Sequence, residues 1–290
     1  MKFKGTPAKK SWNVSGFGNI NDLRALQVSS NVYMFHTALQ IAGVNYVPNS
    51  TLNIKQSAFD TMRHYFKQFG LGVPTEIDLP NEITGQTRQV DSQPGFLLDF
   101  SIGQYDTYTP MQLAQYISTI ANGGYRMKPQ IVKEIRESTM KKGEIGKVMQ
   151  STEPVLLNRV DVKSEYINRV KEGFGWVFQE GDGTGVKYFQ NSPHNPAGKT
   201  GTAETVYGGD DKIGRNEKGA RVECYNLTLV GYAPQDNPEV AFSVVVPWVY
   251  NDKGGINSLI GKEILDSYFN LKEQRMEETD TSTDDSDLKH

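Results

Sequence analysis

The first feature of this sequence that could take part in chemistry is a lysine followed by two threonines around a glycine. Residues Lys199, Thr200, Gly201 and Thr202 lie in a segment with the alternation of a β-strand. A cation beside hydroxyl groups can hold a small anion, and the glycine would let a ligand backbone come close. The alternative is an ordinary edge strand, on which lysine discourages aggregation. A lysine of this kind usually serves a nucleophile, which must be sought elsewhere in the chain.

A second short motif, Ser29-Ser30-Asn31, joins two predicted helices. A hydroxyl and a carboxamide two residues apart on a tight turn can both face one pocket. Serine and asparagine are also the ordinary residues that cap helix N-termini. Considered alone, this motif leaves both interpretations open.

Several elements are predicted to position these residues. Helical spacing of apolar residues predicts helices over residues 21–29, 32–43, 57–70, 109–124, 164–179 and 258–272. Thr109 is suited to cap the fourth of these helices, with Pro110 as its first helical residue. Alternation predicts strands over residues 125–137, 196–207, 223–234 and 238–249. The last three are separated by polar segments typical of an antiparallel meander, and the first of those three carries Lys199.

Helices first, then strands and a closing helix, predict an α+β domain in which helices pack against an antiparallel sheet. We expect residues 1–272 to form this one domain. Residues 273–290 are rich in acidic side chains and are predicted to be a disordered tail.

Composition excludes several functional classes. The charge is nearly balanced, with 31 basic and 34 acidic residues, so no nucleic-acid partner is expected. No apolar run approaches the roughly 20 residues that cross a bilayer, so no membrane segment is expected within the chain. The single cysteine, Cys224, excludes a disulfide within the chain. Neither a metal nor another cofactor is expected, because the four histidines are scattered: His36, His64, His194 and His290.

The two motifs and the text around them resemble the transpeptidase domain of class B penicillin-binding proteins, a family with Ser-x-Asn and Lys-Thr-Gly signatures. The resemblance runs from about Phe3 to Leu271. It includes, in family order, the blocks QVSSNVYMF, FGLGVPTEIDLPNE, SIGQYDTYTPMQLAQYISTIANGG, AGKTGTAE and LVGYAPQDNPEVAFSVVV. It implies the α+β transpeptidase fold that penicillin-binding proteins share with serine β-lactamases.

The resemblance also implies a reaction and a role for each residue. A serine would attack the D-Ala-D-Ala bond of a peptidoglycan stem peptide and pass the acyl group to an amine of a neighbouring strand, and β-lactams would mimic the donor. Ser29 would relay protons to the leaving group, and Asn31 would bind the substrate amide. Lys199 would favour proton release from Ser29 and attract the substrate carboxylate. In the Thr200-Gly201-Thr202 segment, both threonines would hydrogen-bond that carboxylate, and the Thr202 N–H would supply one oxyanion donor.

The family nucleophile is expected in a Ser-x-x-Lys tetrad several dozen residues before the Ser-x-Asn turn, yet none of the 28 residues before Ser29 forms one. The tetrad at Ser138–Lys141, STMK, follows that turn and has the composition of a charged hairpin turn. A nucleophile needs a partly desolvated helix start with its base one turn away, so Ser138 is not expected to be the nucleophile. The chain alone is expected to be inactive.

The same interpretation predicts that the family's N-terminal strands and nucleophile helix are missing. An inner strand, residues 238–249, would then present an unpaired edge, which favours self-association or strand exchange. This chain would be part of an enzyme anchored at the extracytoplasmic face of a bacterial membrane. The alternative is a non-catalytic module that binds cell-wall peptides or a partner protein, although the proton-relay serine favours the enzyme. A serine β-lactamase or β-lactam sensor would share the two motifs but not the blocks at 71–82 and 229–239.

Overall fold

The chain packs as two compact units. The residues that the computed structural model describes are 1–89, 95–210, 214–250 and 254–284. The first unit consists of Met1–Ala25 and Ser29–Glu172, and the second of Leu26–Val28 and the described residues from Gly173 onward. Each unit has its own cluster of buried apolar side chains.

Two helices run from the first unit into the second. They are α1 (Asp22–Gln27) and α6 (Ser164–Gln179). Both lie where helical spacing of apolar residues predicts them. The short segment Leu26–Val28 at the end of α1 therefore belongs to the second unit, while Ser29 begins the next part of the first.

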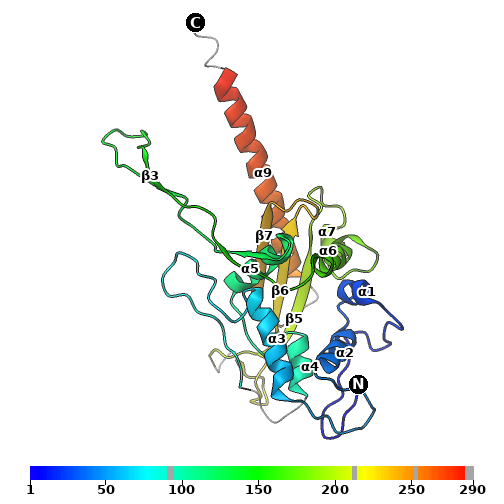
Figure 1. Ribbon diagram of the computed structural model, residues 1–290. Helices are drawn as coiled ribbons and strands as arrows, with labels where there is room; N and C mark the ends of the chain where they lie inside the picture. Colours follow the sequence, from blue (N-terminus) through cyan, green and yellow to red (C-terminus); the bar gives the residue numbers. More distant parts are fainter. Residues whose placement is uncertain (90–94, 211–213, 251–253, 285–290) are drawn as a thin grey trace. The chain divides into compact units, whose positions relative to one another are not determined.

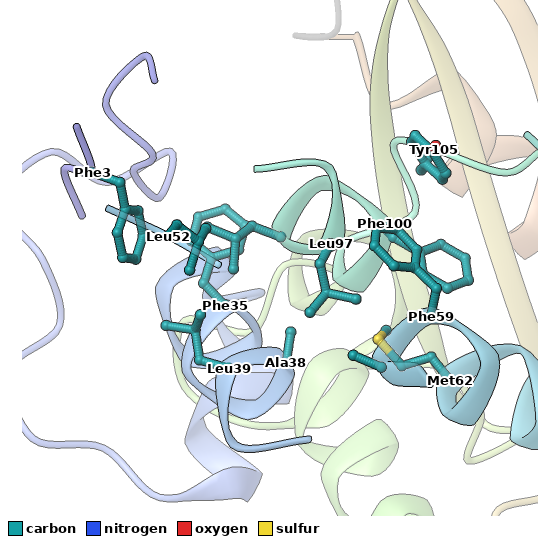
Figure 2. Close-up of a cluster of buried hydrophobic side chains, with 12 residues drawn as sticks. Phe3, Phe35, Ala38, Leu39, Leu52, Phe59, Met62, Leu97, Phe100 and Tyr105 are labelled. Atoms are coloured by element: carbon teal, nitrogen blue, oxygen red, sulfur yellow. The ribbon is translucent and has the colours of Figure 1, made fainter. Parts of the chain in front are cut away.

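Four more helices build the first unit. They are α2 (Asn31–Ile41), α3 (Gln56–Gln68), α4 (Phe96–Ser101) and α5 (Pro110–Ala121). Buried side chains of α2, α3 and α4 meet in one core, in which the rings of Phe59 and Phe100 stack with their centroids 5.9 Å apart (Figure 2). Helix α4 was not predicted, because six residues are too few to show an apolar period.

Helix α5 begins as the sequence predicts. The Thr109 hydroxyl accepts a hydrogen bond from the N–H of Gln112 at 3.2 Å, and the Gln112 side chain accepts one from the N–H of Thr109 at 3.0 Å. This reciprocal pair is a capping box, and Pro110 occupies the first turn. Gln112 also donates to the carbonyls of Val73 and Thr84, so the same side chain fixes the loop before residue 90.

Two pairs of antiparallel strands complete the first unit. Strand β1 (Tyr125–Met127) pairs with β4 (Leu156–Arg159), and β2 (Glu134–Arg136) pairs with β3 (Val148–Ser151). Figure 1 shows the β2–β3 hairpin as a narrow arm. The prediction of one continuous strand over 125–137 is wrong, because Pro129 has no N–H for a sheet and separates β1 from β2.

The second unit contains the predicted meander. Strands β5 (Ala197–Val206), β6 (Glu223–Ala233) and β7 (Val240–Val249) pair antiparallel in the order β5-β6-β7 (Figure 1). Within the described residues, β5 and β7 are therefore the outer strands. On β5, Lys199 lies opposite Val230 and Thr202 opposite Leu227.

Helices cover this sheet with apolar side chains. Phe178 of α6 and Phe189 of α7 (Val186–Phe189) stack with centroids 4.1 Å apart, and they share a core with Leu229, Phe242 and Leu265. Leu265 belongs to α9 (Ile256–Asp284), the long helix that closes the described chain. The sheet and its helices establish the α+β fold class that the sequence predicts.

Helix α9 extends beyond the predicted closing helix. Residues 273–284, predicted as part of a disordered tail, continue the helix. The segment KEQRMEE is made of strong helix formers, and adding residues to an existing helix avoids the cost of nucleation. The predicted disorder of residues 285–290 lies outside the described residues.

Two glycines of β5, Gly198 and Gly201, lie close to neighbouring atoms of different kinds. A Cβ placed on Gly198 would lie 2.2 Å from the Val230 carbonyl oxygen and 2.7 Å from the Phe178 ring. A Cβ on Gly201 would lie 2.2 Å from the Thr228 hydroxyl oxygen and 3.6 Å from that residue's own Cβ. A side chain at position 198 would therefore collide with backbone atoms, whereas a side chain at position 201 would meet only the end of the rotatable Thr228 side chain.

We therefore expect Gly198→Ala to lower the free energy of unfolding by about 2 kcal/mol, as overpacking of a buried site does. Gly201→Ala is the matched control and should lower it by less than about 1 kcal/mol, because the Thr228 side chain can turn away. Urea unfolding of the 290-residue chain measures both. Equal losses in the two variants would contradict this account of β5.

Candidate active site

The lysine of the β5 signature is held close to its own strand. The Lys199 side chain is partly buried, and its Nζ donates a hydrogen bond to the Thr200 carbonyl oxygen at 2.9 Å. Burial lowers the pKa of Lys199 to about 8, because a charged ammonium loses solvation there. Near neutral pH the group is still mostly a cation, but it releases its proton far more easily than an exposed lysine.

The neighbouring threonines differ in their surroundings. Thr200 is partly buried, and its hydroxyl lies 2.6 Å from the hydroxyl of Thr184. Thr202 is exposed. Side chains alternate along a strand, so Thr200 and Thr202 share one face of β5, while Lys199 and Gly201 share the other. The strand thus carries a cation and two hydroxyls within four residues.

The Ser29-Ser30-Asn31 turn lies in the first unit, between α1 and α2. Ser30 is the N-cap of α2, and its hydroxyl accepts a hydrogen bond from the N–H of Tyr33 at 3.4 Å. The Ser30 N–H donates to the Ala25 carbonyl at 2.9 Å, and the Ser30 side chain is buried. The capping interpretation is therefore correct for the middle residue. The flanking Ser29 and Asn31 have side chains that this cap does not use.

Ser29 has an unusual backbone conformation. Its φ is +53°, in the left-handed region that costs a residue with a side chain about 1–2 kcal/mol. Conformations of this kind persist only where the surrounding structure enforces them, and they are concentrated at functional sites. Asn49, Glu76, Asn81, Asn195 and Trp248 also have positive φ, so the conformation of Ser29 does not by itself assign it a role.

Comparisons with known proteins agree with these two signatures. A family model described as "Penicillin binding protein transpeptidase domain" matches residues 1–266. Penicillin-binding protein 2A of Bacillus subtilis is 52% identical over 273 residues, which cover 93% of this chain and 37% of that protein. The chain belongs to the penicillin-binding protein transpeptidase family.

Further relatives support this class B transpeptidase assignment. Penicillin-binding protein H of Bacillus subtilis is 46% identical over 266 residues, covering 92% of this chain and 36% of that protein. The solved structure of penicillin-binding protein 2B from Streptococcus pneumoniae strain R6 has a TM-score of 0.83 and 34% identity, covering 93% of this chain and 43% of that one. The chain spans little more than a third of the length of the two Bacillus proteins.

The STMK tetrad of this penicillin-binding protein domain lies on an exposed turn. Residues Ser138 to Lys141 lie between β2 and β3, and all four are exposed. The Thr139 hydroxyl donates to the Glu144 carbonyl at 2.9 Å, and Lys141 lies 3.9 Å from the Glu144 carboxylate. The prediction of a charged hairpin turn is confirmed. Ser138 and Lys141 are therefore not at the partly desolvated helix start that a nucleophile and its base require.

One residue of the transpeptidase strand's surroundings was missed by the sequence analysis. Thr184 lies in the loop between α6 and α7, within the sequence Gly-Thr-Gly, and its hydroxyl contacts that of Thr200. In the sequence, a threonine between two glycines shortly before the signature strand could have indicated that Thr184 contacts this strand. The Thr184 N–H donates a hydrogen bond to the carbonyl of Gln27, two residues before Ser29. No feature of the sequence indicated this second contact.

Substitutions at the turn separate capping from backbone strain. Ser30→Ala removes the N-cap of α2 and should lower the free energy of unfolding by about 1 kcal/mol. Ser29→Gly relieves a left-handed conformation and should not lower it. Chemical denaturation of both variants provides the measurement. If Ser29→Gly loses as much stability as Ser30→Ala, the two roles assigned here are wrong.

Proposed function

We propose that this chain supplies the carboxylate-binding strand and the Ser-x-Asn turn of a peptidoglycan D,D-transpeptidase that works by serine acyl transfer. The observation that carries the proposal is the partly buried Lys199, with a pKa of about 8, beside Thr200 on β5 of a penicillin-binding protein domain. A cation and hydroxyls on one strand recognise a small carboxylate, such as the C-terminus of a D-Ala-D-Ala peptide. β-Lactams carry a comparable carboxylate and are proposed to use the same groups.

These residues would act at successive steps of the acyl-transfer reaction. The oxygen of a nucleophilic serine attacks the carbonyl carbon between the two D-alanines while its proton passes to the base of its own motif, and the Thr202 N–H stabilises the negative oxygen that forms. The C–N bond then breaks, and Ser29 passes a proton to the departing amine of D-alanine. Asn31 holds the substrate amide. An amine of a second stem peptide then attacks the ester and restores the serine.

The attacking serine is not found before Ser29 in these 290 residues, because no Ser-x-x-Lys tetrad occurs there. The exposed STMK turn does not replace it. We therefore propose that these residues alone bind donor peptides without forming an acyl-enzyme. Removal of a nucleophile and its base leaves only the effects of binding and the remaining oxyanion donors.

We place the intact protein at the extracytoplasmic face of a bacterial membrane, where stem peptides are cross-linked. In the part of the chain that the structure describes, no helix combines the length and the apolar character that crossing a membrane requires.

The carboxylate-binding role predicts a pH-dependent affinity. N-acetyl-D-Ala-D-Ala should bind the 290-residue chain more tightly than its C-terminal amide, because only the former is an anion. As the pH rises through about 8, Lys199 loses its proton and the affinity of the acid should fall. Lys199→Met should weaken binding about tenfold at pH 7, as the loss of a charge-assisted hydrogen bond does, and should remove this pH dependence. NMR titration measures each affinity.

Two outcomes would contradict the proposal. Equal binding of the acid and the amide by wild type and Lys199→Met would exclude a carboxylate site at Lys199. A stoichiometric mass increase after incubation with benzylpenicillin would show that a nucleophile lies within the 290 residues. The Ser138→Ala variant is the control for that measurement, since it removes the serine of the STMK tetrad and would show whether Ser138 carries the added mass.

We also propose that this chain self-associates through an outer strand of its sheet. Within the described residues, β7 pairs only with β6, and its VVV run at 244–246 offers an edge to a second copy. Sedimentation velocity should show dimers or larger species at micromolar concentrations. Val245→Lys, which places a charge on that strand, should shift the chain toward the monomer. A wild-type chain that stays monomeric would refute the proposal.

A further inference from the structure

The Gly-Thr-Gly loop holds Thr184 in a fixed position. A Cβ on Gly183 would lie 2.4 Å from the Trp176 carbonyl oxygen, and one on Gly185 would lie 2.5 Å from the Phe178 ring. The Gly185 N–H also donates to the Val177 carbonyl at 2.9 Å. The loop is therefore pressed onto the last turns of α6, and larger residues could not take the places of these glycines.

From this position Thr184 reaches the signature strand. Its hydroxyl oxygen lies 2.6 Å from the Thr200 hydroxyl oxygen, which is a short hydrogen bond between two hydroxyls. Both residues are partly buried and belong to the second unit. Water competes less for such a hydrogen bond than for one on an open surface.

Thr184 also binds the segment that precedes the Ser29 turn. Its N–H donates to the Gln27 carbonyl at 3.2 Å, and the buried Gln27 carboxamide donates to the Glu180 carbonyl at 2.7 Å. These contacts lie within the second unit, to which Leu26–Val28 belongs. One residue thus hydrogen-bonds both the lysine-bearing strand and the residue two positions before Ser29.

We propose that Thr184 is a positioning residue that orients the Thr200 hydroxyl toward the substrate carboxylate. This inference rests on the proposed function, because it assumes that Thr200 binds that carboxylate. A carboxylate only accepts hydrogen bonds, so the Thr200 proton must point to it. The hydrogen between the two threonines then comes from Thr184, whose O–H donates to the Thr200 oxygen.

This arrangement has two effects on binding. The donated hydrogen bond fixes the rotamer of Thr200, so less side-chain freedom is lost when the ligand arrives. It also polarises the Thr200 O–H, because hydrogen bonds in a chain strengthen one another. Gln27 and the Gly-Thr-Gly loop keep Thr184 itself in place.

The experiment compares Thr184→Val, which keeps the branched shape without the hydroxyl, with Thr184→Ser, which keeps the hydroxyl. Three-bond couplings to the Thr200 methyl carbon report its χ1 rotamer in the ligand-free 290-residue chain. Wild type and Thr184→Ser should show one rotamer, and Thr184→Val should show an average. A single, unchanged Thr200 rotamer in Thr184→Val would overturn the inference, whether or not any ligand binds.

A second measurement tests the consequence for binding. Thr184→Val should weaken binding of N-acetyl-D-Ala-D-Ala about 3- to 10-fold, and Thr184→Ser should stay within about twofold of wild type. The pH dependence due to Lys199 should remain in both, which separates lost positioning from a lost cation. Wild-type affinity in Thr184→Val overturns the inference while the proposed function stands. Failure of wild type to bind overturns the proposed function, and the rotamer measurement still decides the role of Thr184.

Discussion

The sheet of the second unit depends on three glycines that let backbones and aromatic rings come together. Gly198 and Gly231 face each other across β5 and β6. A Cβ on Gly231 would lie 2.7 Å from the Phe242 ring, and one on Gly261 would lie 2.2 Å from a Leu229 methyl. Any side chain at these positions would move a strand or α9 outward. Close packing of this kind leaves β5 little freedom to shift.

That rigidity matters for the lysine next to Gly198. A lysine on a mobile edge would swing into solvent and keep its ordinary pKa. In β5 the Lys199 side chain is partly buried, its Nζ donates to the Thr200 carbonyl oxygen, and its ammonium loses water. Burial is the cause of the lowered pKa of Lys199, because a charged ammonium is less stable where water is excluded.

The sequence predicted what depends on local chemistry and missed what depends on distant contacts. The capping residues Thr109 and Gln112, the meander and the exposed STMK turn all follow from residue types at short spacing. The break between β1 and β2 at Pro129 was not predicted, because apolar and polar residues alternate on both sides of the proline. Helix α4 was not predicted, because six residues are too few to show a helical period of apolar residues. The helical residues after 272 were predicted to be disordered, because acidic residues dominate that segment. Thr184 could not be predicted as a partner of Thr200, since only the folded loop brings them together.

Ser30 shows how one short motif can satisfy two separate requirements. The reaction is assigned to the outer residues of Ser29-Ser30-Asn31, while the middle hydroxyl starts a helix. Selection on the middle position would then follow the rules of helix initiation, which accept serine, threonine, aspartate or asparagine. Sequence drift within that small set would leave the chemistry untouched. Threonine, aspartate or asparagine in place of Ser30 would therefore be compatible with the start of α2.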